Sequence, residues 1–248
     1  MSASVFSRAS KEEGHVHVSK YLSLQVPPTL GSPIPLLHTI SLFSGPISIL
    51  VIRARALAEG GRGRRDAFFK LLVGSEGLPP TLNFYKWPSD KVRDLVVGPI
   101  TEELCFRAVV VPYLLSAGLP PLKCVFVAPL LFGFAHVHHA INRLREGHPF
   151  AITVVNTIFQ FCYTYLFGAY ATYALLKTND VMSVIACHSF CNFMGLPMLP
   201  SPNDREVYVH RGWVYASYFF GLSVFTFGFV IYGSAAKPAG ALGDLTFD

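Results

Sequence analysis

Charged side chains are scarce in this sequence. Only 14% of its 248 residues are Asp, Glu, Lys or Arg, whereas 52% are hydrophobic, and the mean hydropathy is +0.43. A soluble domain of average composition carries about 25% charged residues, which cover its surface. The shortage of charge therefore excludes an ordinary soluble domain and indicates a membrane protein.

Cysteine is also rare, and none of the five cysteines belongs to a C-x-x-C pair. All five lie within apolar segments. They are Cys105, Cys124, Cys162, Cys187 and Cys191. This placement is typical of small hydrophobic side chains in packed helices, rather than of disulfides or a catalytic nucleophile.

The sequence lacks a basic nucleic-acid-binding motif and an internal repeat at a fixed period. Its formal charge of +5 and its pI near 9.0 are therefore interpreted as a sign of membrane topology, not of a nucleic-acid partner. The N-terminal residues are polar, without the apolar core of a cleavable signal sequence. We expect a disordered tail at 1–33, a membrane-embedded domain at 34–236 and a second tail at 237–248.

Two segments are long and apolar enough to cross a bilayer, which requires about 20 residues. They are Phe150–Leu176, which contains no charged residue, and Val214–Ala236. Four weaker candidates contain Pro, Gly or polar residues, which neighbouring helices or cavity water can accommodate. These are Pro35–Ile52, Leu95–Ala117, Leu122–Val137 and Val181–Leu199. The sequence thus predicts an all-α, polytopic bundle of about six transmembrane helices.

The basic residues predict the orientation of this bundle. Most of the 20 Lys and Arg residues fall between residues 53 and 94, in the loop with Arg143 and Arg145, and in the loop with Arg205 and Arg211. Short cytosolic loops carry the excess of Lys and Arg. We therefore expect this side of the bundle to face the cytosol.

Polar residues within three of the predicted spans lie toward that same side. Glu102 is about seven residues from the cytosolic end of the second span, or roughly 10 Å deep at 1.5 Å per residue. His136 lies at the cytosolic end of the third span, and His188 and Asn192 lie in the second half of the fifth. We expect these four side chains to share a similar depth.

The segment EELCFR holds three charges, at Glu102, Glu103 and Arg107. On a helix Glu103 and Arg107 share a face, whereas Glu102 points about 100° away. A charge within a membrane is costly unless it is paired or faces water, so the spacing predicts a structural Glu103–Arg107 ion pair. Glu102 is then the candidate general base, and a carboxylate in a wet crevice is the alternative.

Two further motifs contain histidine. FGFAHVHH places His136 one turn after Phe132, and His136 is the candidate for chemistry because it lies deeper than the two histidines that follow it. CHSFCN places His188 and Asn192 on one face of a helix. These two side chains could donate hydrogen bonds to an oxyanion, or they could form a polar contact that packs helices. The spacing leaves both interpretations open.

The three motifs follow one another on hydrophobic segments: EELCFR fits E-E-x-x-x-R, FGFAH fits F-x-x-x-H and HSFCN fits H-x-x-x-N. Over about residues 95–197 they resemble the type II CAAX prenyl endopeptidases, or Ras-converting enzymes, within the abortive-infection-like membrane proteases. The resemblance implies a protease of the endoplasmic reticulum membrane with a site facing the cytosol. Such an enzyme removes the last three residues from prenylated C-a-a-X proteins of the small GTPase type.

The resemblance also implies residue roles. Glu102 and His136 would activate the attacking water, His188 and Asn192 would stabilise the oxyanion, and the predicted ion pair would support the site. No cofactor is needed for this glutamate-type hydrolysis.

A zinc-dependent version of the same hydrolysis is the alternative. Glu102, His136 and His188 would form a His₂Glu set with an open fourth position. The metal-free version is favoured because the sequence has no H-E-x-x-H motif and because Asn192 is a poor zinc ligand but a good hydrogen-bond donor.

Two other classes of protein also place ionisable residues inside membrane helices. A carrier would do so, although it would be expected to show pseudo-repeats, which the sequence lacks. A non-catalytic scaffold of the same fold would bind partners without forming any product.

Overall fold

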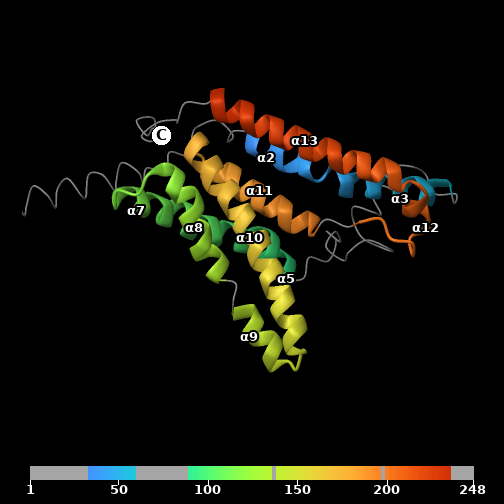
Figure 1. Cartoon of the computed structure of the whole chain (residues 1–248), viewed down its shortest axis with the longest axis horizontal. Helices are drawn as coiled ribbons and strands as arrows, with labels where there is room; N and C mark the ends of the chain where they lie inside the picture. Colours follow the sequence, from blue (N-terminus) through green and yellow to red (C-terminus); the bar gives the residue numbers. More distant parts are fainter. Residues whose placement is uncertain (1–32, 60–88, 136–137, 197–198, 236–248) are drawn as a thin grey trace, which may run out of the picture. The chain divides into compact units, whose positions relative to one another are not determined.

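The computed structural model describes residues 33–59, 89–135, 138–196 and 199–235, and every regular element within these ranges is helical (Figure 1). This confirms the predicted all-α class. The predicted tails lie outside these ranges, except for Pro33, which begins the first helix. The chain divides into two compact units: one contains Thr101–Val184, and the other contains Pro33–Ile100 and Ile185–Ala235.

The unit Thr101–Val184 is organised by the packing of α8 along α10. Its helices are the π-helix η4 (Leu104–Val110), α7 (Val111–Ser116), α8 (Pro121–Ala135), α9 (His138–Arg145) and α10 (Phe150–Thr178). Small and branched side chains such as Val111, Ala128 and Ala171 are buried in its core. Where α10 passes α8, the Tyr165 hydroxyl donates a hydrogen bond to the Phe126 carbonyl at 3.3 Å.

In the second unit, α13 packs along both α2 and α3 (Figure 1). Its helices are α2 (Pro33–Leu42), α3 (Ser44–Glu59), α5 (Ser89–Val92), the π-helix η3 (Arg93–Val97), α12 (Arg205–Val209) and α13 (Arg211–Ala235). Ile49, Val207 and Val214 form a small buried core. The Arg53 Nη2 atom lies 2.8 Å from Asp204 Oδ2, which joins α3 to the start of α12. Two further helices, α6 (Gly98–Glu103) and α11 (Val181–Met194), each include residues of both units.

The first predicted span is bent rather than straight. Helix α2 ends at Leu42, α3 begins at Ser44, and the two axes differ by 64°. Pro46 accounts for the break, because a proline has no N–H and its ring clashes with the carbonyl four residues earlier, here that of Leu42. A Cβ atom at Gly45 would overlap the Tyr218 ring, so glycine lets α13 approach the bend closely.

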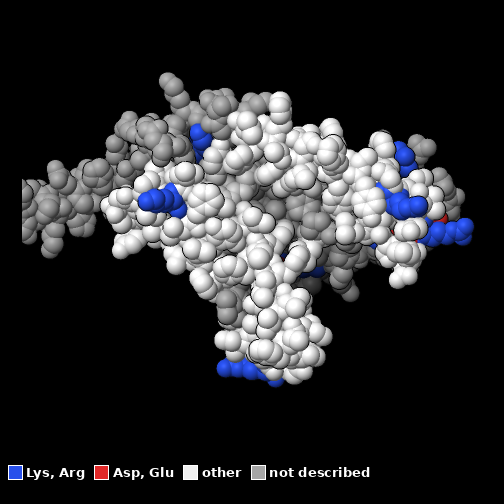
Figure 2. Space-filling model, viewed as in Figure 1, with Lys and Arg blue, Asp and Glu red and all other residues white. Residues whose placement is uncertain are grey.

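Among the described helices, three segments are long and apolar enough to cross a membrane: Pro121–Arg145, Phe150–Thr178 and Arg211–Val230. The bent pair of α2 and α3 would be a fourth, and α11 is apolar but shorter. On the face shown in Figure 2, the described surface is largely uncharged. These features are those of a helical membrane protein, and the count of about six spans stays a prediction. Arg143 and Arg145, which were expected in a loop, lie in α9.

Candidate active site

The EELCFR motif lies on a helical stretch that runs from Ser89 to Ser116 and contains two π-helical segments, η3 and η4. Each segment includes the residue four positions before a proline: Leu95 before Pro99 in η3, and Ala108 before Pro112 in η4. Because a proline cannot bond to that carbonyl and its ring crowds it, a locally widened helix relieves the conflict. At the end of η3 the Gly98 N–H donates to the Arg93 carbonyl, five residues back. Short π-helical segments are frequent at functional sites.

The predicted Glu103–Arg107 ion pair is present, and both side chains are completely buried. Arg107 Nε lies 3.1 Å from Glu103 Oε2, and Arg107 Nη1 donates to Glu103 Oε1 at 3.2 Å. Two parallel contacts fix the relative orientation of the guanidinium and the carboxylate. Loss of one partner would leave the other charge buried, so the pair constrains the helix that carries it.

Three residues from α8 and α10 enclose the Arg107 guanidinium. Its central carbon lies 4.4 Å from the centroid of the Phe132 ring and 5.8 Å from that of Phe167. A Cβ atom at Gly168 would lie 3.1 Å from Arg107 Nη2, so a larger residue there would crowd the cation. The aromatic faces attract the cation electrostatically. Neither Phe167 nor Gly168 was predicted to take part, although a lone glycine within a long apolar helix is a usable signal of close packing.

Glu102 occupies α6 beside Glu103 and is partly buried. It is close enough to Arg107 to attract the guanidinium electrostatically, as Glu103 does. The helical spacing makes Glu102 point away from the ion pair, yet both carboxylates attract the Arg107 guanidinium. Glu102 is thus a partly accessible carboxylate next to a rigid, buried pair.

Helix α11 carries the third motif, and it begins where the Asp180 carboxylate accepts a hydrogen bond from the Met182 N–H at 2.9 Å. His188 is buried, and Asn192 is exposed one turn further along. The Asn192 side-chain nitrogen donates to the Asp94 carbonyl of η3 at 2.9 Å. An amide nitrogen carries two hydrogens, so a second N–H exists for another acceptor.

The candidate residues are distributed over both units. The three charges of EELCFR belong to the unit Thr101–Val184, whereas His188 and Asn192 belong to the other. His136 lies outside the described residues, so its place and the common depth of the four side chains stay predictions. Within the described ranges no group of three His, Cys, Asp or Glu side chains could hold a metal ion. The zinc set that includes His136 therefore also stays a prediction.

Comparison with known proteins gives the family. Residues 89–194, from α5 to the end of α11, match the family described as type II CAAX prenyl endopeptidase Rce1-like. These residues are therefore Rce1-like. All three motifs of this Rce1-like chain lie within the matched residues, including both members of the buried ion pair and the Phe132 ring that covers Arg107.

Three relatives of the Rce1-like chain are named as CAAX prenyl proteases. CAAX prenyl protease 2 of Homo sapiens is 34% identical over 195 residues, which are 77% of this chain and 54% of that protein. The probable CAAX prenyl protease 2 of Schizosaccharomyces pombe is 44% identical over 108 residues, 43% of this chain and 40% of that protein. CAAX prenyl protease 2 of Caenorhabditis elegans is 39% identical over 137 residues, which are 54% of this chain and 50% of that protein. The chain thus spans about half the length of these relatives, and no solved structure matches it.

Proposed function

We propose that this chain is an endopeptidase that hydrolyses the peptide bond after the prenylated cysteine of a C-terminal C-a-a-X sequence. The observation that carries the proposal is the family match over residues 89–194, in which the EELCFR motif forms a fully buried ion pair. The substrates would be prenylated proteins of the small GTPase type. The enzyme would reside in the endoplasmic reticulum membrane with its site facing the cytosol.

In the proposed reaction, Glu102 and His136 hold a water molecule and accept its proton as the oxygen attacks the carbonyl carbon. The carbonyl oxygen becomes an oxyanion and receives hydrogen bonds from His188 and from the second N–H of Asn192. The carbon–nitrogen bond then breaks, and the proton passes to the leaving amine. The products are a protein that ends in a prenylcysteine carboxylate and a free tripeptide.

The buried ion pair would act as a positioning element. Glu103 precedes the π-helical segment η4 and is bound through both oxygens to Arg107. The rotation of α6 about its axis is therefore fixed, and with it the direction of the neighbouring Glu102 side chain. Such restraint matters because a general base must lie within hydrogen-bond reach of the proton that it accepts.

A cleavage assay on a farnesylated C-a-a-X peptide tests the proposal, with the full chain in phospholipid vesicles and with or without a chelator. We expect cleavage that resists the chelator and is abolished in Glu102→Ala and His136→Ala. Glu146→Ala and His148→Ala remove exposed side chains of the same types and should keep full activity. Full activity in Glu102→Ala would refute the mechanism, and cleavage that requires zinc would favour the metal alternative.

A further inference from the structure

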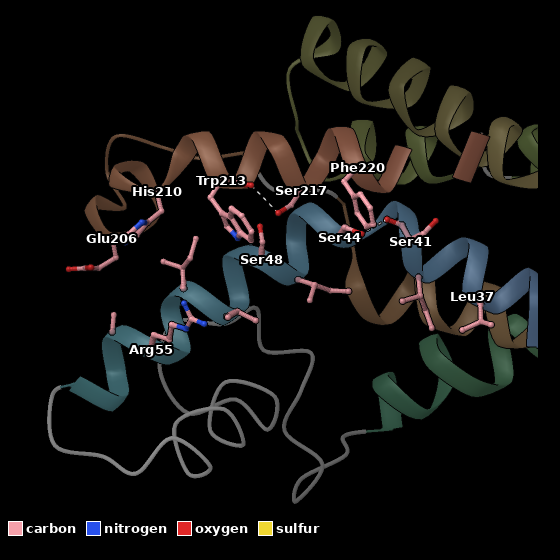
Figure 3. Close-up of a pocket in the computed structure, with 15 residues that line it drawn as sticks. Leu37, Ser41, Ser44, Ser48, Arg55, Glu206, His210, Trp213, Ser217 and Phe220 are labelled. Atoms are coloured by element: carbon pink, nitrogen blue, oxygen red, sulfur yellow. Dashed lines mark hydrogen bonds between the residues drawn. The ribbon is translucent and has the colours of Figure 1, made fainter. Parts of the chain in front are cut away.

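A long groove lies within the second unit, bordered by α2 and α3 on one side and by α12 and α13 on the other (Figure 3). Its volume is about 1090 Å³, slightly above the usual range of about 300–1,000 Å³ for ligand pockets. Hydrophobic side chains such as Leu37, Trp213 and Phe220 line most of its length. The ionisable lining residues Arg55, Glu206 and His210 gather at one end (Figure 3).

Four serines also line the groove, but their hydroxyl groups are engaged within their own helices. Each donates to a backbone carbonyl three or four residues earlier, at 2.7–2.9 Å. The serines are Ser41, Ser44, Ser48 and Ser217. Because these donors are already satisfied, the wall of the groove presents a largely apolar surface that suits a hydrocarbon chain.

Basic side chains outnumber acidic ones around the charged end of the groove. Arg55 is exposed there, opposite His210 and Glu206 (Figure 3). Two exposed arginines lie at the starts of the adjoining helices, Arg205 in α12 and Arg211 in α13. Figure 2 shows basic side chains gathered around this end of α3 and α12. The described side chains here favour an anionic ligand group.

The part of the groove that runs along α3 is about as long as one leaflet of a bilayer is thick. From Ser44 to Arg55, α3 rises about 16 Å at 1.5 Å per residue. This is close to half of a hydrocarbon core of about 30 Å. Trp213, which is 69% exposed, lies near the charged end, as expected for an aromatic residue at the level of the lipid headgroups.

We propose that this groove binds one anionic phospholipid. One of its two acyl chains would lie along α3 and α13, and its phosphate would contact Arg55 and His210. Glu206 suits the ammonium group of a phosphatidylserine headgroup. The basic end is the one that the distribution of Lys and Arg assigns to the cytosolic side, where anionic lipids are concentrated. Lipid binding here is separate from the proposed peptide hydrolysis and does not require it.

Photolabelling tests this inference. The full chain is placed in phosphatidylcholine vesicles that contain phosphatidylserine with a photoreactive group on its acyl chain, and labelled residues are mapped by mass spectrometry. We expect labels on α3 and α13 at groove residues, and less labelling by the matching phosphatidylcholine probe. Arg55→Gln should lower phosphatidylserine labelling about fivefold, the effect of one basic side chain near an anionic lipid. Arg145→Gln makes the same charge change at an exposed position of α9, outside the groove lining, and should retain labelling.

A second pair of variants tests occupancy without changing charge. Ser217→Phe inserts a ring into the groove and should remove the label, whereas Ser223→Phe places the same ring on an exposed position of α13 outside the lining. Equal labelling by both probes, or displacement of the label by a farnesylated peptide, would overturn the proposal. A protein–protein cross-link that joins a groove residue to another segment, or to a second copy of this chain, would show a different occupant and would also overturn it. Glu102→Ala should label normally, so failure of the hydrolase proposal would be distinguished from failure of this one.

Discussion

The guanidinium carbon of Arg107 lies 4.4 Å from the centroid of the Phe132 ring. The arginine of E-E-x-x-x-R is thus in direct contact with the phenylalanine of F-x-x-x-H. The two motifs are joined by a packing contact between η4 and α8, independently of any catalytic role. The first three predictions concern this buried cluster.

Phe132→Ala should destabilise the protein by about 3 kcal/mol, because it leaves a cavity and removes the aromatic face that covers a buried cation. Thermal unfolding of the purified protein in vesicles would measure the loss. Phe159→Ala truncates an exposed ring on α10 and should change the unfolding temperature little. Equal unfolding temperatures for the two variants would contradict this account of the cluster.

Gly168→Ala should cost about 1–3 kcal/mol, because the added methyl group would meet Pro129 Cβ at 3.0 Å and Arg107 Nη2 at 3.1 Å. Gly212→Ala is the matched control, since a Cβ there meets nothing within 4 Å. The control should be neutral or slightly stabilising, because alanine favours helices over glycine. Thermal unfolding compares the two, and a Gly168→Ala variant as stable as the control would show that the close approach is not restrictive.

Arg107→Met should destabilise the protein by about 3–5 kcal/mol, because the Glu103 carboxylate would remain buried without its cation. Glu103→Leu should have a similar effect for the converse reason. The double variant should recover much of the loss, since apolar groups of similar volume carry no desolvation cost. Unfolding measurements on the four proteins give the coupling free energy, and strictly additive losses would rule out the coupling.

The same double variant separates stability from positioning. If the pair orients Glu102, the double variant should fold but cleave the farnesylated peptide with a reduced kcat. A purely structural pair predicts a kcat that recovers together with stability.

Asn192→Ala should lower kcat by about 10²- to 10³-fold if its amide donates to the oxyanion. It also removes the hydrogen bond to the Asp94 carbonyl, which should cost about 1 kcal/mol of stability. Asn142→Ala truncates an exposed asparagine on α9 and should change neither quantity. Loss of stability with an unchanged kcat would show that Asn192 serves only to pack α11 against η3.

Local spacing was enough to predict several of these features. The Glu103–Arg107 pair follows from two residues four apart on one helix, and α11 holds His188 and Asn192 one turn apart, as expected. The bend at Leu42 could also have been predicted, because Pro46 stands four residues later. The lining of the groove could not, because its residues come from segments about 150 positions apart in the chain.

Composition and helical periodicity by themselves determined that this protein is an all-helical membrane protein with a paired charge in EELCFR. Those properties depend on the free energy of leaving water and on 3.6 residues per turn, which are local to each segment. Only the tertiary structure decided that Phe132 covers Arg107, that Gly168 makes room for it, and that α3 and α13 form a groove. These contacts join residues far apart in the chain, and they depend on how the helices pack against one another, which no local pattern specifies.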